Sequence, residues 1–172
     1  MDSWFQDDTV IEQQPRSNET EQENPFVRWL VRDAWKTTDI PYLLVETPHM
    51  LHDQGLPLQS IRLFVRTLNP QLYGLFFNWD RDSNEGETLQ ATHKGVQSDS
   101  YRNSPFAPII NGEGGVRRRL DVDEPELDFP ILTDLLDEGA TDYVALPIQF
   151  SDGQINTLSL VSDMPGGFST SH

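Results

Sequence analysis

The last third of the chain contains the pattern that most restricts the possible fold. Two runs rich in apolar residues, 143–150 and 154–161, meet at Asp152-Gly153. An Asp-Gly pair between two such runs is a strong signal for a two-residue hairpin turn, because glycine accepts the positive φ that the turn needs. The sequence therefore predicts an antiparallel pair of strands across Asp152-Gly153, preceded by a crossover helix over residues 129–138.

A further helix start follows this hairpin. The segment Pro165-Gly166-Gly167-Phe168-Ser169 leads into a run of Ser and Thr, which are residue types that cap the first turn of a helix. The sequence stops at His172, so we expect the C-terminal helix to be missing or truncated. We also expect the chain to be a piece of a longer protein.

The residues before the hairpin carry both helix and strand signals. Asn24-Pro25 is typical of a helix start. A second helix is expected from Asp39 to Gly55, kinked or divided at Pro48, because proline removes a backbone hydrogen bond. The pattern then predicts strands at 61–66 and 74–79, a polar turn region over 80–87, a short helix from Asn103 to Gly112, a strand at 116–120 and a helix capped by Asp128. Together these elements indicate an α+β fold, with an antiparallel sheet flanked by helices.

Residues 1–24 differ in composition from the rest of the chain. Seven Asp and Glu residues stand there against the single Arg16, and most other positions are polar. Such a segment buries too little apolar surface to offset an ordering cost of about 1–2 kcal/mol per residue. We therefore expect a disordered acidic tail over residues 1–24, whose deletion leaves the melting temperature nearly unchanged, and one domain over residues 25–172.

The overall charge restricts the possible partners. The formal net charge is −16, whereas binding to nucleic acid or to anionic membranes depends on a basic surface. We expect neither partner. The N-terminus lacks the basic and apolar regions of an export signal, so a cytoplasmic location is expected. The absence of cysteine excludes disulfides and thiolate metal sites.

The ending of the chain, strand–Asp152-Gly153–strand and then PGGFS, resembles the last hairpin of GAF-type sensor domains. A longer series of short motifs is similar to the N-terminal region of certain bacterial class III adenylate/guanylate cyclases, over roughly residues 26–169. These motifs are GLPL (55–58), RTLNP (66–70), SYRNSP (100–105), RRRL (117–120), LDFP (127–130), EGATDY (138–143), FSDG (150–153) and PGGFS (165–169).

The resemblance implies a GAF-like sheet, a following helix that pairs with its copy in a homodimer, and a cyclase catalytic domain further along the parent protein. The chain departs from the family at Asn69, where the family usually has His. It also has no segment that matches the two metal-binding aspartates, the Asn and the Arg of such catalytic domains. We therefore expect no catalytic residues, no metal site, no cofactor and no cyclic nucleotide formation by this chain.

Four residues are candidates for ligand binding. In GAF-like domains the region equivalent to 98–110 covers the ligand pocket, which makes Tyr101 and Ser104 candidates; capping and packing also explain both. Arg118 belongs to a basic cluster, 117–119, whose guanidinium groups suit an anionic ligand but can equally pair with the acidic residues 121–126. Asp142 is expected either to line a ligand cleft or to bond a helix-to-strand turn.

The function expected on this basis is that of a non-catalytic regulatory domain at the front of an adenylate/guanylate cyclase, acting as a sensor or by dimerisation in cyclic nucleotide signalling. The expected partners are a second copy of the chain, the downstream cyclase domain and, for a sensor, a small molecule. The alternative is a structural dimerisation or partner-docking module without a small-molecule ligand.

Overall fold

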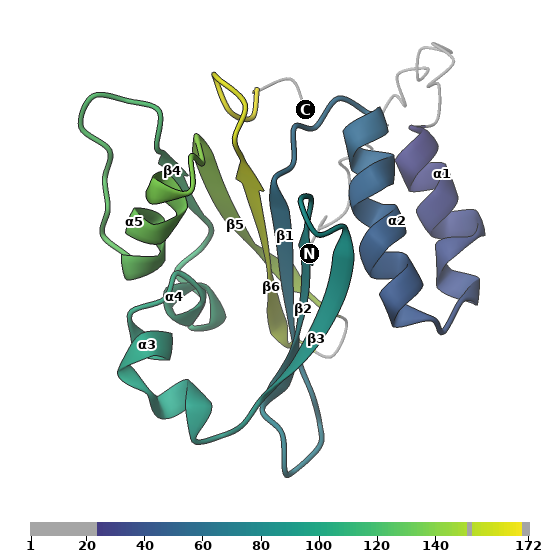
Figure 1. Cartoon of the computed structure of the whole chain (residues 1–172). Helices are drawn as coiled ribbons and strands as arrows, with labels where there is room; N and C mark the ends of the chain where they lie inside the picture. Colours follow the sequence, from purple (N-terminus) through teal and green to yellow (C-terminus); the bar gives the residue numbers. More distant parts are fainter. Residues whose placement is uncertain (1–23, 151–152, 170–172) are drawn as a thin grey trace, which may run out of the picture.

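The computed structural model describes residues 24–150 and 153–169 of the chain. These residues form a six-stranded antiparallel sheet with the strand order β3-β2-β1-β6-β5-β4 (Figure 1). The strands are β1 Ser60–Arg66, β2 Gly74–Asp80, β3 Glu85–Ala91, β4 Val116–Arg119, β5 Asp142–Gln149 and β6 Ile155–Ser162. The α+β class and the antiparallel sheet expected from the sequence are confirmed.

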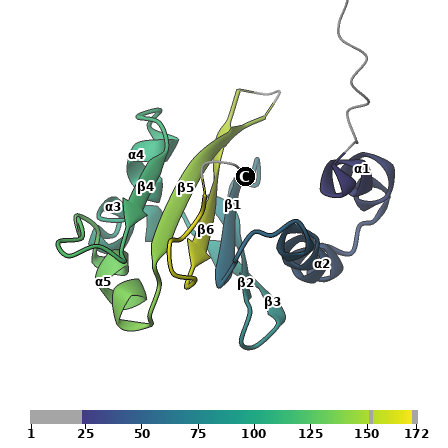
Figure 2. The ribbon, with the colours of Figure 1, turned by 90° about the horizontal axis from the view of Figure 1, so that it is seen from above.

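Helices cover both faces of the sheet, so the described residues form three layers (Figure 2). Helices α1 and α2 lie on one face and α3, α4 and α5 on the other. Their bounds are α1 Pro25–Arg32, α2 Ile40–Asp53, α3 Asp99–Arg102, α4 Phe106–Ile110 and α5 Pro130–Asp137, with single 3-10 turns η1 Ala34–Lys36 and η2 Gly95–Gln97. No helix in the described ranges is long and apolar enough to cross a bilayer.

The C-terminal hairpin forms as predicted, with one difference in its turn. Strands β5 and β6 pair from Asp142 opposite Ser162 to Gln149 opposite Ile155. The N–H of Phe150 also donates to the carbonyl of Gln154 at 3.0 Å. Three residues therefore lie between the bonded residues Phe150 and Gln154 instead of two, and Gly153 has the positive φ of 81° that such a loop needs. Asp152 lies outside the described residues.

The N-terminal helices also form where their caps predict. The Asn24 side chain accepts from the N–H groups of Phe26 and Val27, and Asp39 accepts from the N–H of Tyr42. Pro48 was expected to kink or divide the second helix; the division was wrong, since α2 runs through Pro48 without a break. Pro48 is fully buried, so its packing helps to offset the missing hydrogen bond.

Two further expectations are corrected. The polar turn predicted over 80–87 ends at Asn84, which has a φ of 51°, and Glu85–Ala91 forms the edge strand β3 along β2. This strand lacks alternating apolar residues and is held by its backbone pairing, so its sequence carries no strand signal. Asp128 does not cap the helix that follows: the N-cap of α5 is Phe129, and Asp128 binds Arg118.

The core divides into three clusters. One lies under α4 and α5 and includes Ile109, Leu132, Tyr143 and Val161. A second lies under α2 and includes Leu58, Ile61, Trp79 and Phe168. The third, which we call the aromatic cluster, consists of Phe64, Ala91 and Phe106, with Tyr73, Phe76, Tyr101 and Ile110 packed against them. The aromatic cluster closes one end of the sheet face that carries α3–α5.

Candidate functional site

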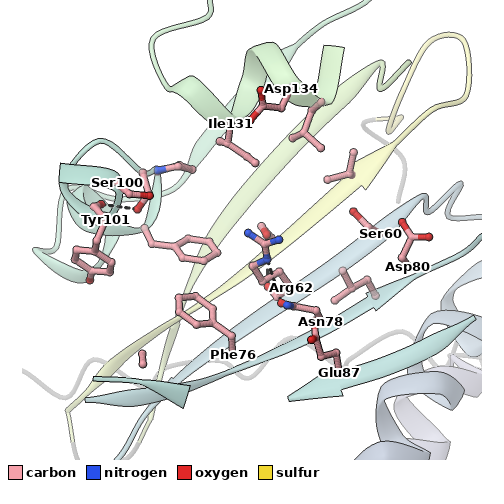
Figure 3. Close-up of a pocket in the computed structure, with 18 of the residues that line it drawn as sticks. Ser60, Arg62, Phe76, Asn78, Asp80, Glu87, Ser100, Tyr101, Ile131 and Asp134 are labelled. Carbon is pink, nitrogen blue, oxygen red and sulfur yellow. Dashed lines mark hydrogen bonds between the residues drawn. The ribbon is translucent and has the colours of Figure 1, made fainter. Parts of the chain in front are cut away.

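A groove of about 1220 Å³ lies between the sheet and the layer of α3 and α5 (Figure 3). Its floor is formed by β1, β2, β3 and β6, one wall by residues 95–106 and the other by α5. The residues that line it include Ser60, Arg62, Phe76, Asn78, Asp80, Glu87, Ser104, Phe106, Ile131, Asp134, Glu138 and Tyr143. The groove therefore occupies the place between the sheet and residues 98–110 where a ligand pocket is expected.

Strand register places the floor residues in rows, because residues directly opposite one another on neighbouring strands point to the same face. One row crosses the sheet from Glu87 through Asn78 and Arg62 to Ser159. The adjacent row on one side contains Phe76 and Phe64, and the adjacent row on the other contains Asp80 and Ser60. A charged and polar row thus crosses the middle of the floor, beside an aromatic one.

Arg62 stands at the centre of this floor. Its Nε donates to Asn78 Oδ1 at 3.0 Å, and Figure 3 shows its guanidinium rising from the sheet into the groove below Ile131 and Asp134. The charge of Arg62 also acts on Tyr143: burial raises the pKa of the Tyr143 phenol, and Ser159 and Arg62 partly oppose that rise. The phenol is therefore neutral at physiological pH.

Tyr101 and Ser104, two of the predicted site residues, are both at the groove wall. Tyr101 belongs to the aromatic cluster, and its ring meets that of Tyr73 edge-on, with centroids 6.4 Å apart. Burial raises the pKa of Tyr101 well above its ordinary value, so its phenol also stays neutral. The Ser104 hydroxyl donates to the carbonyl of Tyr101 at 2.7 Å and thereby holds the turn between α3 and α4.

Arg118 is on the same face of the sheet but does not line the groove. It donates to both carboxylate oxygens of Asp128, at 3.0 and 2.6 Å, and lies 3.3 Å from a carboxylate oxygen of Glu126. The hydrogen bond to Asp128 raises the pKa of Arg118. The pairing of this basic cluster with nearby acids, one of the two expected alternatives, is what the structure contains; Arg119 likewise binds Asp121.

Asp142 lies on the opposite face of the sheet and is also separate from the groove. Its side chain is 0 % exposed and binds Arg117, whose Nη2 is 2.6 Å from Oδ2. The same oxygen accepts the N–H of Phe168 at 3.0 Å, and Arg117 donates to the carbonyl of Phe168 at 2.6 Å. Asp142 thus fastens the end of the described chain to β5, so it does not line a cleft.

The structure therefore brings together two of the four predicted site residues and adds others that sequence reasoning missed. Arg62, Asn78 and Glu87 come from three strands, and their proximity depends on the pairing register. The sequence signal that existed was the alternation of arginines with apolar residues along 61–66, which places Arg62 and Arg66 on one face of β1. No motif singled out Arg62 among them.

Within the described residues, no three His, Asp or Glu side chains gather as a metal ion would require. His49 of α2 bonds Asn84 Oδ1 at 3.0 Å and meets the Trp79 ring edge-on. The groove offers a guanidinium, carboxylates, hydroxyls and aromatic walls. These groups suit the binding of a small polar molecule with an apolar part.

No protein-family model and no curated protein sequence matches this chain.

Proposed function

We propose that the chain is a non-catalytic, GAF-like regulatory domain that binds a small molecule in the groove beneath α3–α5. The observation that carries the proposal is the groove itself, with its polar row on the sheet and its aromatic end. Ligand pockets are typically concave and largely apolar, with a few polar groups that fix orientation. A cytoplasmic location is part of the same proposal.

The proposed context is the N-terminal side of a class III adenylate/guanylate cyclase. The motif series from 55–58 to 165–169 supports it, and the six-stranded antiparallel sheet with helices on both faces is compatible with a GAF-like domain. Cyclase sites of this class form at a dimer interface, so a small rotation of an upstream domain changes their assembly. Ligand binding in the groove would bias that rotation.

The sensor proposal is tested by a thermal-shift screen of nucleotides and small metabolites, with two matched variants. Ser60→Trp places a bulky ring at the groove floor, whereas Thr133→Trp places the same ring on an exposed position of α5 that does not line the groove. A ligand that stabilises the wild type and Thr133→Trp but not Ser60→Trp supports the proposal. No stabilising ligand in the whole library contradicts it.

The cyclase context is tested separately. The purified chain is expected to make no cyclic nucleotide from ATP or GTP with Mg²⁺ or Mn²⁺, because it lacks a metal-binding aspartate pair to stabilise the reacting phosphates. Fusion to a class III catalytic domain should make cyclase activity depend on the groove ligand. Turnover by the chain alone would refute the non-catalytic assignment.

A second candidate function is dimerisation without a ligand. The observation that favours it is the apolar, exposed side of the N-terminal helices, which includes Val27, Leu30, Val31 and Trp35. In that case the groove would remain solvent-filled and the surface of α1 would carry the function.

A further inference from the structure

Arg62 differs from four other arginines of this fold in how it is held. Arg81, Arg117, Arg118 and Arg119 each bind a carboxylate. Arg62 is held by the neutral amide of Asn78, and no carboxylate of the described residues lies within ion-pair distance of it. Asn78 thus orients the guanidinium through Nε without neutralising its charge.

The opposite edge of the Arg62 guanidinium is free to bind a ligand. Its Nη1 and Nη2 make no hydrogen bond to another described residue, and the side chain is exposed to the groove. Two parallel N–H groups of this kind match the two oxygens of a carboxylate, which they bind as a fork. The floor of the groove therefore has an oriented site for an anionic group.

The rim of the groove has the opposite charge. Glu87, Asp134 and Glu138 line it, and their side-chain carboxylates have no hydrogen-bond or ion-pair partner among the described residues. Asp80 also lines it, but its carboxylate accepts from the N–H groups of Asp82 and Ser83 in the following turn. A purely anionic ligand would meet repulsion from this rim, and a purely cationic ligand would meet repulsion from Arg62.

Part of the remaining groove surface is apolar. Phe76 and Phe106 stack at one end, with ring centroids 5.8 Å apart, and Ile131 and Leu135 face them from α5. Figure 3 shows Phe76 on the sheet beside Arg62, and Ile131 across the groove from both. A ligand with an apolar or aromatic body would cover these side chains and release their water.

We propose that the groove binds a zwitterionic small molecule with an apolar body, of the α-amino-acid type, with its carboxylate on Arg62 and its ammonium group facing the rim carboxylates Glu87 and Asp134. This inference rests on the proposed sensor function and specifies the ligand class of the same groove. The chemistry of recognition is shared by a free amino acid and by a short peptide, which differ in the distance between their two charges.

The test compares a zwitterion with two analogues that each lack one of its two charges. Isothermal titration compares L-phenylalanine with N-acetyl-L-phenylalanine, which lacks the ammonium group, and with 2-phenylethylamine, which lacks the carboxylate. L-leucine, L-methionine and the dipeptide Leu-Phe are titrated beside them. Binding of at least one zwitterion is expected, with a loss of at least about tenfold in affinity when either charge is removed.

Two variants on one face of one strand supply the control. Arg62→Gln should weaken zwitterion binding at least about tenfold, whereas Arg66→Gln, four residues along β1 and outside the groove, should leave it unchanged. Glu87→Gln combined with Asp134→Asn should weaken the zwitterion while leaving or improving the binding of N-acetyl-L-phenylalanine. The thermal melting curve of each variant shows whether it is folded. Arg62→Lys keeps the positive charge but loses the two parallel N–H donors, so its affinity for the zwitterion separates the contribution of the charge from that of the bidentate geometry.

The inference is overturned when no zwitterion binds at about 10 mM, where a ligand with a Kd near 1 mM occupies most sites. It is also overturned when N-acetyl-L-phenylalanine and 2-phenylethylamine bind as tightly as the zwitterion. The same holds when the folded Arg62→Gln variant binds the zwitterion as tightly as the wild type does. If the library screen finds a different ligand, and Ser60→Trp abolishes its binding, the sensor function is supported but the zwitterion is excluded as its ligand. A stronger response to Leu-Phe than to the free amino acids would assign the groove to peptide ends.

Discussion

At the scale of single residues, the charged groups of Asp142 and Arg62 differ in burial and in the charge of their partners. Asp142 is buried and its carboxylate oxygens accept three hydrogen bonds, two from Arg117 and one from the N–H of Phe168. Arg62 is exposed and keeps its charge available. A charge buried with full hydrogen bonding stabilises one conformation, whereas a charge oriented by a neutral partner is suited to bind something else.

Replacing Asp142 tests its structural role. Asp142→Asn puts an amide where Arg117 and the Phe168 N–H both donate, so one donor loses its acceptor. We expect the free energy of unfolding to fall by about 2–3 kcal/mol, a value below that of a fully buried pair because Arg117 is 39 % exposed. Chemical denaturation measures it. Asp128→Asn, which breaks the more exposed pair with Arg118, should cost about 1 kcal/mol or less, and equal losses in the two variants would contradict this role.

The pair of Arg81 and Asp163 predicts a pH dependence. Arg81 binds both oxygens of Asp163 and lowers the pKa of this carboxyl. A lowered pKa means that the pair stabilises the folded chain above the ordinary aspartate pKa of about 3.9, and that this contribution is lost as the pH falls through the folded-state value. Asp163→Asn should therefore lower stability at pH 6–7 by about 1 kcal/mol or less.

Urea denaturation at a series of pH values measures this difference. The gap between the wild type and Asp163→Asn should begin to shrink below about pH 4, where the unfolded carboxylate takes up a proton, and it should close as the pH falls through the lowered pKa of the folded carboxyl. A gap that stays constant down to pH 3 would show that the substitution acts through packing instead of charge.

At the scale of elements, the segment after β6, residues 163–169, behaves as a clamp on the sheet. Besides Asp163 and Phe168, it is held by the Thr141 hydroxyl, which donates to the carbonyl of Met164 at 2.6 Å, and by the Gly166 N–H, which donates to Asp121 Oδ2 at 2.9 Å. Residues 170–172, where the C-terminal helix is expected to start, lie outside the described residues. The clamp fixes the direction in which the chain leaves the sheet.

Two neighbouring glycines in this clamp allow a matched test. Gly167 has a φ of 58°, and a Cβ there would lie 2.5 Å from the Cβ of Asp142, whereas Gly166 has a φ of 88° with open space around it. Gly166→Ala should cost only the backbone strain, about 1–2 kcal/mol, but Gly167→Ala also displaces Asp142 and should cost about 2 kcal/mol more. Thermal melting compares them, and equal costs would argue against a tight clamp.

The sequence predicted elements with strong local signals and missed those that depend on distant partners. The hairpin of β5 and β6 and the helix α5 were predictable because the turn signal and the apolar spacing that define them all lie within one short segment, from Pro130 to Ser162. Strand β3 was not, because its pairing with β2 comes from backbone groups that leave no side-chain pattern. The same reason applies to the site: Tyr101 and Ser104 lie in a local segment, but the row of Glu87, Asn78 and Arg62 exists only through strand register.

At the scale of the whole molecule, the surface combines a high negative charge with an apolar stripe. Val27, Leu30 and Val31 recur at helical spacing on α1, and the adjoining Trp35 continues the exposed surface. Val31 and Trp35 are 67 % and 71 % exposed. Burial of such a stripe against a second copy releases water from both surfaces and stabilises association, while the net charge of −16 on each copy opposes it.

This balance predicts self-association that increases with salt, because about 0.1 M salt screens charges beyond roughly 10 Å whereas the apolar contact is unaffected. Sedimentation analysis at low and high NaCl should show the dimer fraction rising. Val31→Glu should shift the chain to monomer by placing two carboxylates in the contact. Thr133→Glu adds the same charge on exposed α5 and should leave the dimer intact, which separates a specific α1 contact from a general charge effect. A monomer at every salt concentration, or an equal response of the two variants, would exclude α1 as the contact and leave the groove as the functional surface.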